Sequence, residues 1–330
     1  MDQLLTRRSW LAAVGASLAA TARAADPANR PALIAITLDL EMSRNFPTWE
    51  TTHWDYEKGN LNAETKAYVV EAARRVKQRG GRLHCFVVGR VLEQENVDWL
   101  RQLAAEGHVL GNHTYDHVNV KATRPADIQF RFQRSPWLVE GRQPAEIIRE
   151  NVRLTTAAMQ SRLNVAPRGF RTPGGFANGL ADREDIQRML LDLGFAWVSS
   201  QYPGHKITAA KEGEPPTEPT DEVIQSIVAA QAHAHPFRYP SGLVEVPMNP
   251  ISDIGAFRTG RWKLDWFLRA IRAGVEWAIN QRATFDFLGH PSCLYVTDPQ
   301  FKMIDLICDL VEQAGDRAKL SDLEALSKRA

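Results

Sequence analysis

The sequence predicts a single α/β domain whose parallel strands curl into a distorted (β/α) barrel. Short apolar runs rich in branched residues alternate about seven times with amphipathic helical stretches, and no repeat or internal boundary interrupts this alternation. No glycine-rich phosphate fingerprint follows the first strand, which argues against an open doubly wound sheet. Polar residues follow the strands instead, and a barrel gathers its catalytic groups at those positions.

The elements are expected in the following order. Residues 33–38 form a nearly continuous apolar run, which is typical of a strand buried on both faces. Residues 43–60 are too long for a tight connection and are interpreted as a functional loop, and the helix at 62–79 is closed by two glycines. Further strands are expected at 82–88, 107–110, 169–171, 195–200, 243–246 and 284–288, further helices at 96–105, 144–163, 182–193, 263–280 and 301–314, and a surface loop at 211–221.

The composition is that of an ordinary globular protein. The chain has 330 residues, a formal charge of +1 and 44% hydrophobic residues, enough for a large core. Its basic residues are scattered, which excludes a nucleic-acid surface and a polybasic membrane patch. Three cysteines without close spacing, Cys85, Cys293 and Cys308, argue against a disulfide framework and against a thiolate zinc site.

Residues 1–25 are predicted to be a twin-arginine export signal. Arg7 and Arg8 precede the weakly apolar run 11–22, and Ala22-Arg23-Ala24 provides a small-x-small cleavage site. The alternative is an N-terminal helix of the mature domain. Residues 26–32 are interpreted as a linker and 33–330 as the barrel domain. Because no later apolar run could span a bilayer, we expect a periplasmic or secreted protein without stable membrane insertion.

Two pairs of side chains indicate a metal site. His113 and His117 are four residues apart, so on a helical turn both imidazoles could reach one ion; the alternative is two histidines on a loop. Asp39 and Glu41 are two residues apart at the end of the first strand and leave the same face. Burying two carboxylates there costs free energy unless a cation neutralises them. The alternative is that one of them only caps the loop. One carboxylate, two imidazoles and an open position suit zinc, and less specifically other divalent ions.

Four motifs occur in an order and spacing that resemble the polysaccharide deacetylase family, the NodB-homology domain of carbohydrate esterase family 4. They are residues 37–41 (Thr-Leu-Asp-Leu-Glu), 113–117 (His-Thr-Tyr-Asp-His), 171–175 (Arg-Thr-Pro-Gly-Gly) and 288–290 (Leu-Gly-His). The resemblance extends from about residue 33 to the final helix, and the second and third motifs are the specific ones. It implies a distorted (β/α)-type barrel and the metal-assisted hydrolysis of an acetamide or an acetyl ester.

The resemblance also implies a role for single residues. Asp39 resembles the general base that activates a metal-bound water, and Arg171 the arginine that holds this base. His113 and His117 resemble the two imidazole ligands. His290 resembles the general acid that protonates the leaving group.

The motifs depart from the family pattern at two positions. Leu40 stands where the family usually has a metal-binding aspartate, so Glu41 is expected to replace that ligand in an Asp-x-Glu variant. Gly174 stands where many members have an aromatic residue, and its backbone N–H is expected to supply an oxyanion contact. These departures resemble a branch of the superfamily that includes peptidoglycan deacetylases and allantoinase-like hydrolases.

Further residues are candidates for the substrate site. Trp197 resembles the tryptophan of the family's fourth motif and is equally a candidate core residue. Trp54 and Tyr56 form either a stacking wall for a sugar ring or a lid over the barrel mouth. Asp253 and Asp286 are the two candidates for orienting His290, and the sequence does not choose between them.

Three functions follow from these patterns. The first is an exported, metal-dependent hydrolase that removes acetyl groups from an N- or O-acetylated saccharide, with zinc as the expected ion. The second, motivated by Leu40, is an allantoinase-like hydrolase of a small non-peptide C–N compound with weak or no metal. The third is a non-catalytic carbohydrate-binding protein, against which the near-complete set of Asp39, His113, His117, Arg171 and His290 argues.

Overall fold

The computed structural model describes residues 30–52, 58–207, 209–210 and 215–330, and residues 31–330 pack as one unit. The predicted export signal lies outside the described residues, as does most of the predicted linker, and both stay predictions. Among the described helices, none has both the length and the apolar character that crossing a membrane requires.

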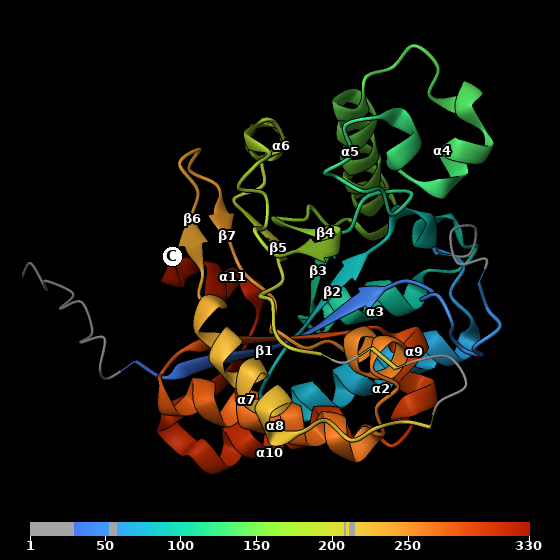
Figure 1. Cartoon of the computed structure of the whole chain (residues 1–330). Coiled ribbons are helices and arrows are strands. Elements are labelled where there is room, and N and C mark those ends of the chain that lie inside the picture. Colours follow the sequence, from blue (N-terminus) through green and yellow to red (C-terminus); the bar gives the residue numbers. More distant parts are fainter. Residues whose placement is uncertain (1–29, 53–57, 208, 211–214) are drawn as a thin grey trace, which may run out of the picture. The chain divides into compact units, whose positions relative to one another are not determined.

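The core of the protein is a curled, mostly parallel sheet (Figure 1). Its strands follow the order β6-β7-β5-β4-β3-β2-β1-β8, with β9 also paired to β1, and only the pair β6 and β7 is antiparallel. The strands are β1 (Ala32–Leu40), β2 (Leu83–Val87), β3 (Val109–Asn112), β4 (Gly169–Phe176), β5 (Trp197–Gln201), β6 (Phe237–Arg238), β7 (Val244–Glu245), β8 (Thr284–Gly289) and β9 (Ala318–Ser321). The predicted α/β fold of the barrel type is therefore confirmed.

The first strand, β1, is buried along its whole length, as its apolar run predicts. It pairs with β8 on one side and with β9 and then β2 on the other. Its alternate side chains enter different apolar clusters: Ile34 and Ile36 pack with the surrounding helices, whereas Leu33 and Ala35 pack inside the curl of the sheet. Because the side-chain period of a strand is two, Asp39 lies on the same inner face as Leu33.

The two sides of the sheet approach each other beyond β7. The backbone N–H of Asn249 donates to the carbonyl of Asp286 in β8 at 3.0 Å, and the Asn249 side-chain oxygen accepts from the N–H of Leu288 at 3.2 Å. This segment joins the β7 side to β8, and Gln231 and Ala234, just before β6, also form hydrogen bonds with Thr284 at the start of β8. The sheet is therefore a half-barrel with an irregular junction, in agreement with the expected distortion.

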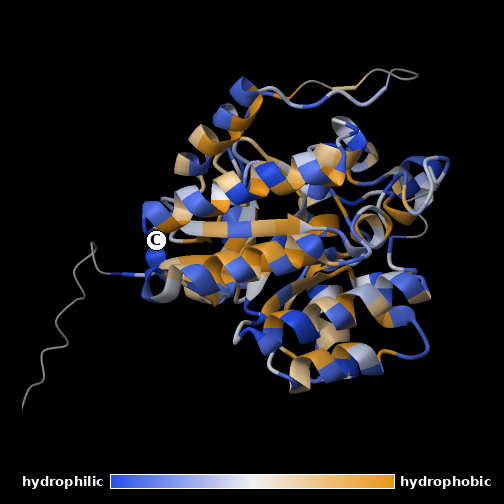
Figure 2. Cartoon of the chain, turned by 90° about the horizontal axis from the view of Figure 1, so that it is seen from below, coloured by the Kyte–Doolittle hydropathy of each residue, from blue (hydrophilic) through white to orange (hydrophobic). Residues whose placement is uncertain are grey.

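Amphipathic helices cover the sheet. Figure 2 shows their outward faces in mixed colours, whereas the strand visible between them is mostly hydrophobic. In Figure 1, α2, α8 and α10 lie on one side of β1, and α5 and α6 lie toward the other end of the sheet. The helices are α2 (Ala63–Gln78), α3 (Asp98–Ala105), α4 (Phe130–Arg134), α5 (Pro144–Leu163), α6 (Glu184–Asp192), α7 (Asp221–Ala230), α8 (Leu264–Asn280), α9 (Pro291–Thr297), α10 (Lys302–Ala314) and α11 (Leu323–Leu326).

Two long helices begin where capping residues in the sequence predict a helix start. Helix α2 follows Asn62, whose side chain accepts a hydrogen bond from the backbone N–H of Thr65 at 2.8 Å. Helix α5 begins at Pro144, and Gln143 and Glu146 form a capping box before it.

The sequence interpretation missed several short elements. Helix α7 directly follows the predicted surface loop, and its cap Thr220 was assigned to that loop. Helix α9 is only seven residues long and starts directly after His290, while β9 has four residues and pairs with the beginning of β1. Such elements are too short for a periodic pattern and depend on tertiary partners.

Candidate metal centre and active site

The end of β1 places two carboxylates inside the barrel. Asp39 is the last residue but one of this strand, and Glu41 follows its end. Both side chains are buried, with exposed fractions of 4% for Asp39 and 3% for Glu41. Since alternate side chains share a face, both point toward the space enclosed by the sheet, as the sequence predicts.

His113 and His117 come together through a loop rather than a helical turn. The segment follows β3 directly, and its backbone is left-handed at Thr114 and His117, with φ angles of 59° and 56°. The Asn112 side-chain oxygen accepts from the N–H of Thr114 at 2.9 Å, and the Thr114 hydroxyl accepts from the N–H of Val118 at 3.0 Å. The helical geometry was therefore wrong, but the loop still brings the two imidazole rings to a centroid distance of 5.1 Å.

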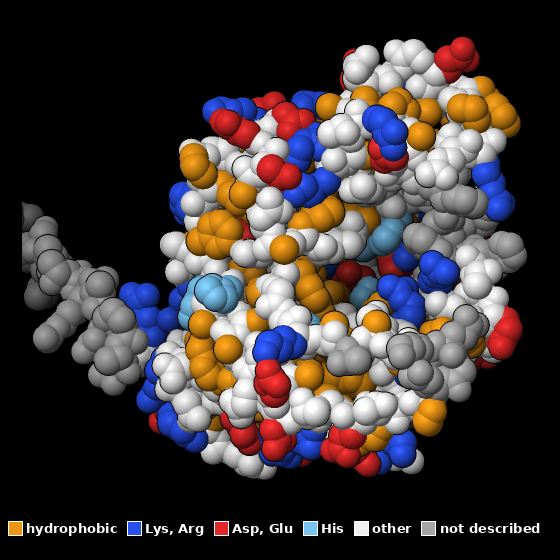
Figure 3. Space-filling view, in the orientation of Figure 1, with side chains coloured by type: hydrophobic (Ala, Val, Ile, Leu, Met, Phe, Trp, Pro, Cys, Tyr) orange, Lys and Arg blue, Asp and Glu red, His pale blue; other side chains and the backbone are white. Residues whose placement is uncertain are grey.

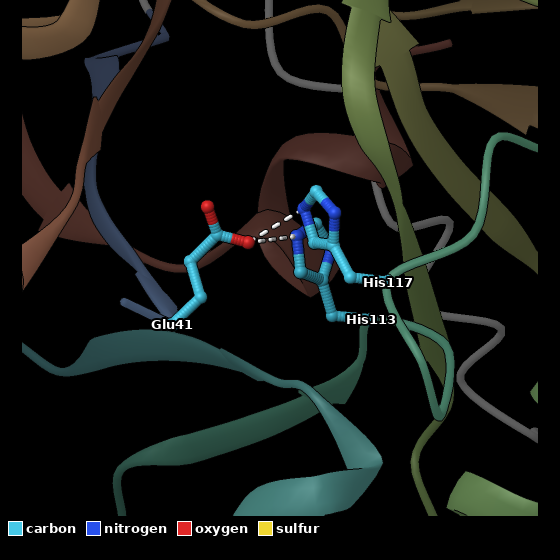
Figure 4. Close-up of side chains that lie close together, drawn as sticks. All are labelled: Glu41, His113 and His117. Carbon is cyan, nitrogen blue, oxygen red and sulfur yellow. Dashed lines mark ion pairs between the residues drawn. The ribbon is translucent and has the colours of Figure 1, made fainter. Parts of the chain in front are cut away.

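Glu41, His113 and His117 form a group that could hold a metal ion. Their ligand atoms all lie within 4.8 Å of one another (Figure 4). The Glu41 Oε2 atom is 2.5 Å from His117 Nε2 and 3.7 Å from His113 Nε2. A carboxylate and two imidazoles are a donor set that zinc accepts, and the spacing fits the predicted role of Glu41.

The orientation of His113 supports this assignment. Its Nδ1 atom lies 2.9 Å from the carbonyl oxygen of Arg171, which accepts a hydrogen bond from the Nδ1–H, so the lone pair belongs to Nε2. The buried Nε2 atom has no hydrogen-bond partner within the described part of the chain. A buried nitrogen of this kind, aimed at a carboxylate and a second imidazole, suits a metal ligand.

The protonation states of the group also suit a metal. Burial lowers the pKa of His117 to about 4 against the opposing charge of Glu41, so its ring is neutral near pH 7. Burial alone would raise the pKa of Glu41, but His117 and the ammonium of Lys58 outweigh it and hold this pKa well below its usual range. Lys58, which is itself buried, forms an ion pair with Glu41 Oε1. No sequence pattern pointed to Lys58.

Arg171 in β4 is fully buried and holds the Asp39 carboxylate. Its Nη1 atom is 3.1 Å from Asp39 Oδ1 and 2.7 Å from the Thr37 hydroxyl, and its Nη2 atom pairs with Asp286. The guanidinium also lies 4.3 Å from the centre of the Phe86 ring. Burial raises the pKa of Asp286 to about 6, although Arg171 opposes this shift. These contacts leave Asp39 Oδ2 facing the histidine group, 3.6 Å from His113 Nε2.

His290 lies on the other side of the group and is oriented by Asp253. Its Nδ1 atom is 2.8 Å from Asp253 Oδ1, and its backbone N–H donates to Asp253 Oδ2 at 2.6 Å. Its Nε2 atom lies 4.0 Å from Asp39 Oδ2 and 3.9 Å from Glu41 Oε1. Burial lowers the pKa of His290, but Asp253, Glu41 and Asp39 outweigh it, so the net pKa is raised. Asp253, and not Asp286, is therefore the partner that the sequence left open.

Asp39, Glu41, His117 and His290 border one cavity of about 470 Å³. Figure 3 shows the hollow, with acidic and histidine side chains inside it and basic side chains beside it. Gly174 borders the cavity with a φ angle of 76°, a conformation that favours glycine. The sequence interpretation did not identify several other residues of the cavity wall, among them Arg44, Lys58, Tyr202 and Arg258.

The three aromatic candidates for the substrate site are Trp197, Trp54 and Tyr56. Trp197 has an exposed fraction of 2% and packs edge-on against Phe86 and His84 within the curl of the sheet. It does not border the cavity because it occupies the first position of β5, away from the strand end. Its burial agrees with the core interpretation, and its role in substrate binding stays a prediction. Trp54 and Tyr56 lie outside the described residues.

Comparisons with known proteins agree with this fold. Residues 56–189 match a family model described as polysaccharide deacetylase. No curated protein sequence matches the chain. A Mycobacterium smegmatis protein assigned as a polysaccharide deacetylase has a similar structure, with a TM-score of 0.58 and 14% identity over 91% of this chain and 90% of that one. A Pseudomonas aeruginosa PAO1 protein with the same assignment has a TM-score of 0.59 and 12% identity, over 92% of both chains. Puue allantoinase has a TM-score of 0.54 and 11% identity, over 92% of this chain and 91% of that one.

Proposed function

We propose that this chain, which resembles the polysaccharide deacetylases and matches their family model over residues 56–189, is a metal-dependent hydrolase that removes acetyl groups from an N- or O-acetylated saccharide. The matched region contains the motifs at 113–117 and 171–175, and β1 and β8 supply the other two. The observation that carries the proposal is the convergence of Asp39 and His290 on one group of possible metal ligands within a single cavity.

The proposed metal ligands are Glu41, His113 and His117. A bound divalent ion would polarise the acetyl carbonyl and lower the pKa of the attacking water. The protein's own part is to present one anionic carboxylate and two neutral imidazoles, and the shifted pKa values of Glu41 and His117 maintain those states. We propose zinc as the ion because of this donor set.

Asp39 is the proposed proton acceptor. Arg171 binds its Oδ1 atom, which orients the carboxylate and leaves Oδ2 directed toward the ligand group. Water would add to the acetyl carbon while its proton passes to Oδ2 of Asp39. The backbone N–H of Gly174, on the cavity wall, is proposed to stabilise the oxyanion that forms.

His290 is the proposed proton donor. Asp253 accepts a hydrogen bond from its Nδ1–H and favours the protonated ring, and in that ring the second proton is on Nε2, which faces the cavity. Cleavage of the bond between the acetyl carbon and the leaving nitrogen or oxygen would then transfer this proton to the leaving group. The products are acetate and a free amine or hydroxyl.

We also propose export through the twin-arginine route, on the evidence of residues 1–25 alone.

One observation favours a second candidate, a metal-free hydrolase of a small non-peptide C–N compound. The ammonium of Lys58 already neutralises Glu41, so the site does not need a metal for charge balance. The fold is also similar to that of Puue allantoinase. The acetyl-saccharide proposal remains the stronger one, because the family match covers the histidine pair, one of whose buried nitrogens lacks a partner among the described residues.

The test combines elemental analysis with acetate release. Protein purified without chelator is expected to contain about one divalent ion per chain and to release acetate from N- or O-acetylated oligosaccharides. Removal of the ion should abolish this activity, and zinc should restore it. Hydrolysis of small ureides by metal-free protein would instead support the second candidate. Saccharide binding without hydrolysis under any metal supplement would support a carbohydrate-binding protein and contradict both enzymes.

Replacing Asp253 with asparagine should change the pH dependence of the reaction. The Asp253 carboxylate stabilises the protonated form of His290, so its loss lowers the pKa of that imidazole. A proton donor is active below its pKa, so the alkaline limb of the kcat/KM profile should move to lower pH. Asparagine preserves the shape of the side chain, and KM should change little. A profile that matches the wild type would contradict the positioning role of Asp253.

A further inference from the structure

Two arginines that border the catalytic cavity have no partner among the residues that the structure describes. Arg44 lies in the loop after β1, and Arg258 lies in the short π-helix Ile254–Thr259. Within the described residues, neither guanidinium makes a hydrogen bond or an ion pair. Burial lowers the pKa of Arg258, and the nearby charge of Arg44 adds to this effect, while Glu41 and Asp253 oppose it. Both cations therefore border the same cavity.

The acidic groups of the site do not require these arginines. Asp39 pairs with Arg171, Glu41 with Lys58, and Asp253 with His290. Asp286, behind the cavity, also pairs with Arg171. Each carboxylate already has a cation or a histidine at hydrogen-bond distance.

The charge balance becomes positive when a metal is added. With His290 neutral and no metal bound, the cationic side chains Arg44, Lys58, Arg171 and Arg258 equal in number the carboxylates Asp39, Glu41, Asp253 and Asp286. A divalent ion on Glu41, His113 and His117 would leave two positive charges in excess. Unpaired charges in a partly buried site are costly, and a bound anion would offset that cost.

We propose that Arg44 and Arg258 bind a carboxylate carried by the substrate, so that the saccharide processed at this site is a sugar acid rather than a neutral sugar. This inference rests on the proposed deacetylase function. A guanidinium presents paired N–H donors that match a planar carboxylate, which is why arginine suits this role. Two guanidinium groups on one wall would also orient the substrate.

The position of Arg258 indicates which part of the substrate carries the charge. Asp253 caps the π-helix through its side chain, which accepts from the N–H of Ile254 at 2.8 Å, and the same carboxylate orients His290. Arg258 therefore belongs to the element that positions the proton donor. Because His290 protonates the leaving group, the carboxylate is expected on the sugar and not on the acyl group.

The experiment compares two matched substrates. One is an N-acetylated oligosaccharide with a carboxylate on each acetylated unit, and the other is its carboxyl-reduced form. The wild type should show kcat/KM for acetate release about tenfold higher on the acid, because only the acid can accept charge-assisted hydrogen bonds from the two guanidinium groups. Arg258→Gln should bring this ratio close to one, and Arg44→Gln should lower it less because Arg44 is exposed.

The control is Arg272→Gln, which removes the same charge from the exposed face of α8, where Arg272 lies 3.5 Å from Glu276. It should keep the wild-type ratio. A ratio near one in the wild type, or an unchanged ratio in both cavity variants, would overturn the inference while leaving the deacetylase function intact. If neither saccharide releases acetate, the proposed function fails. Calorimetric binding of the same two saccharides to the wild type and to Arg258→Gln then decides the inference, which stands only if the acid binds more tightly and the variant loses that preference.

Discussion

Asp39→Asn should reduce acetate release by about 10²–10⁴-fold, which is the usual contribution of a positioned acid or base. The carboxylate Oδ2 atom faces the ligand group, and an amide of the same shape cannot accept a proton there. Arg171 can still donate to the side-chain oxygen of asparagine, so the local geometry should survive. The measurement is the steady-state rate of acetate release, together with metal content and near-UV circular dichroism to confirm folding.

A second variant separates the loss of the base from the loss of a partner for Arg171. Asp286→Asn removes the other carboxylate bound by this arginine but does not change a group that faces the cavity. It should lower the rate much less than Asp39→Asn. If Asp39→Asn kept acetate release within tenfold of the wild type, or if both variants lost activity equally, Asp39 would not be the proton acceptor.

Glu41→Gln is expected to weaken zinc binding by at least about 100-fold, since even residues that only support metal ligands contribute 10–100-fold. The variant removes the carboxylate of the ligand group and breaks the buried ion pair between Glu41 and Lys58. Breaking a buried ion pair in this way costs about 3–5 kcal/mol, so the unfolding temperature should also fall. Zinc affinity is measured by competition with a chelating dye, and stability by calorimetry.

Lys58→Gln provides the matched comparison. It removes a positive charge that repels a divalent ion and competes for Glu41, so zinc affinity should rise about tenfold or more. The double variant Glu41→Gln/Lys58→Gln should recover part of the lost stability, because no unpaired charge stays buried, but it should not recover zinc binding. Wild-type zinc affinity in Glu41→Gln would show that Glu41 is not a ligand and would favour the metal-free alternative.

The sequence predicted those parts of the site that depend on local periodicity. The buried run before Asp39 indicated a strand, and the two-residue period of a strand placed Asp39 and Glu41 on one face. The motifs around His113 and Arg171 pointed to the proposed metal ligands and to the arginine that pairs with Asp39, and these residues do lie beside Asp39. Such features depend on residues that are near one another in the chain or on patterns shared with a family.

Other features of the site depend on contacts between distant parts of the chain. Lys58 meets Glu41 across a loop, Asp253 meets His290 across 37 residues, and Arg258 reaches the cavity from a short π-helix. A lone lysine, aspartate or arginine has the same local pattern whether it is paired, positioned or solvated, so its role is set by what the folded chain brings beside it. By itself, the sequence determined the fold class and the set of reactive groups. The tertiary structure alone decided how their charges are paired and which cations face the substrate, because Coulomb interactions depend on distances in space and not along the chain.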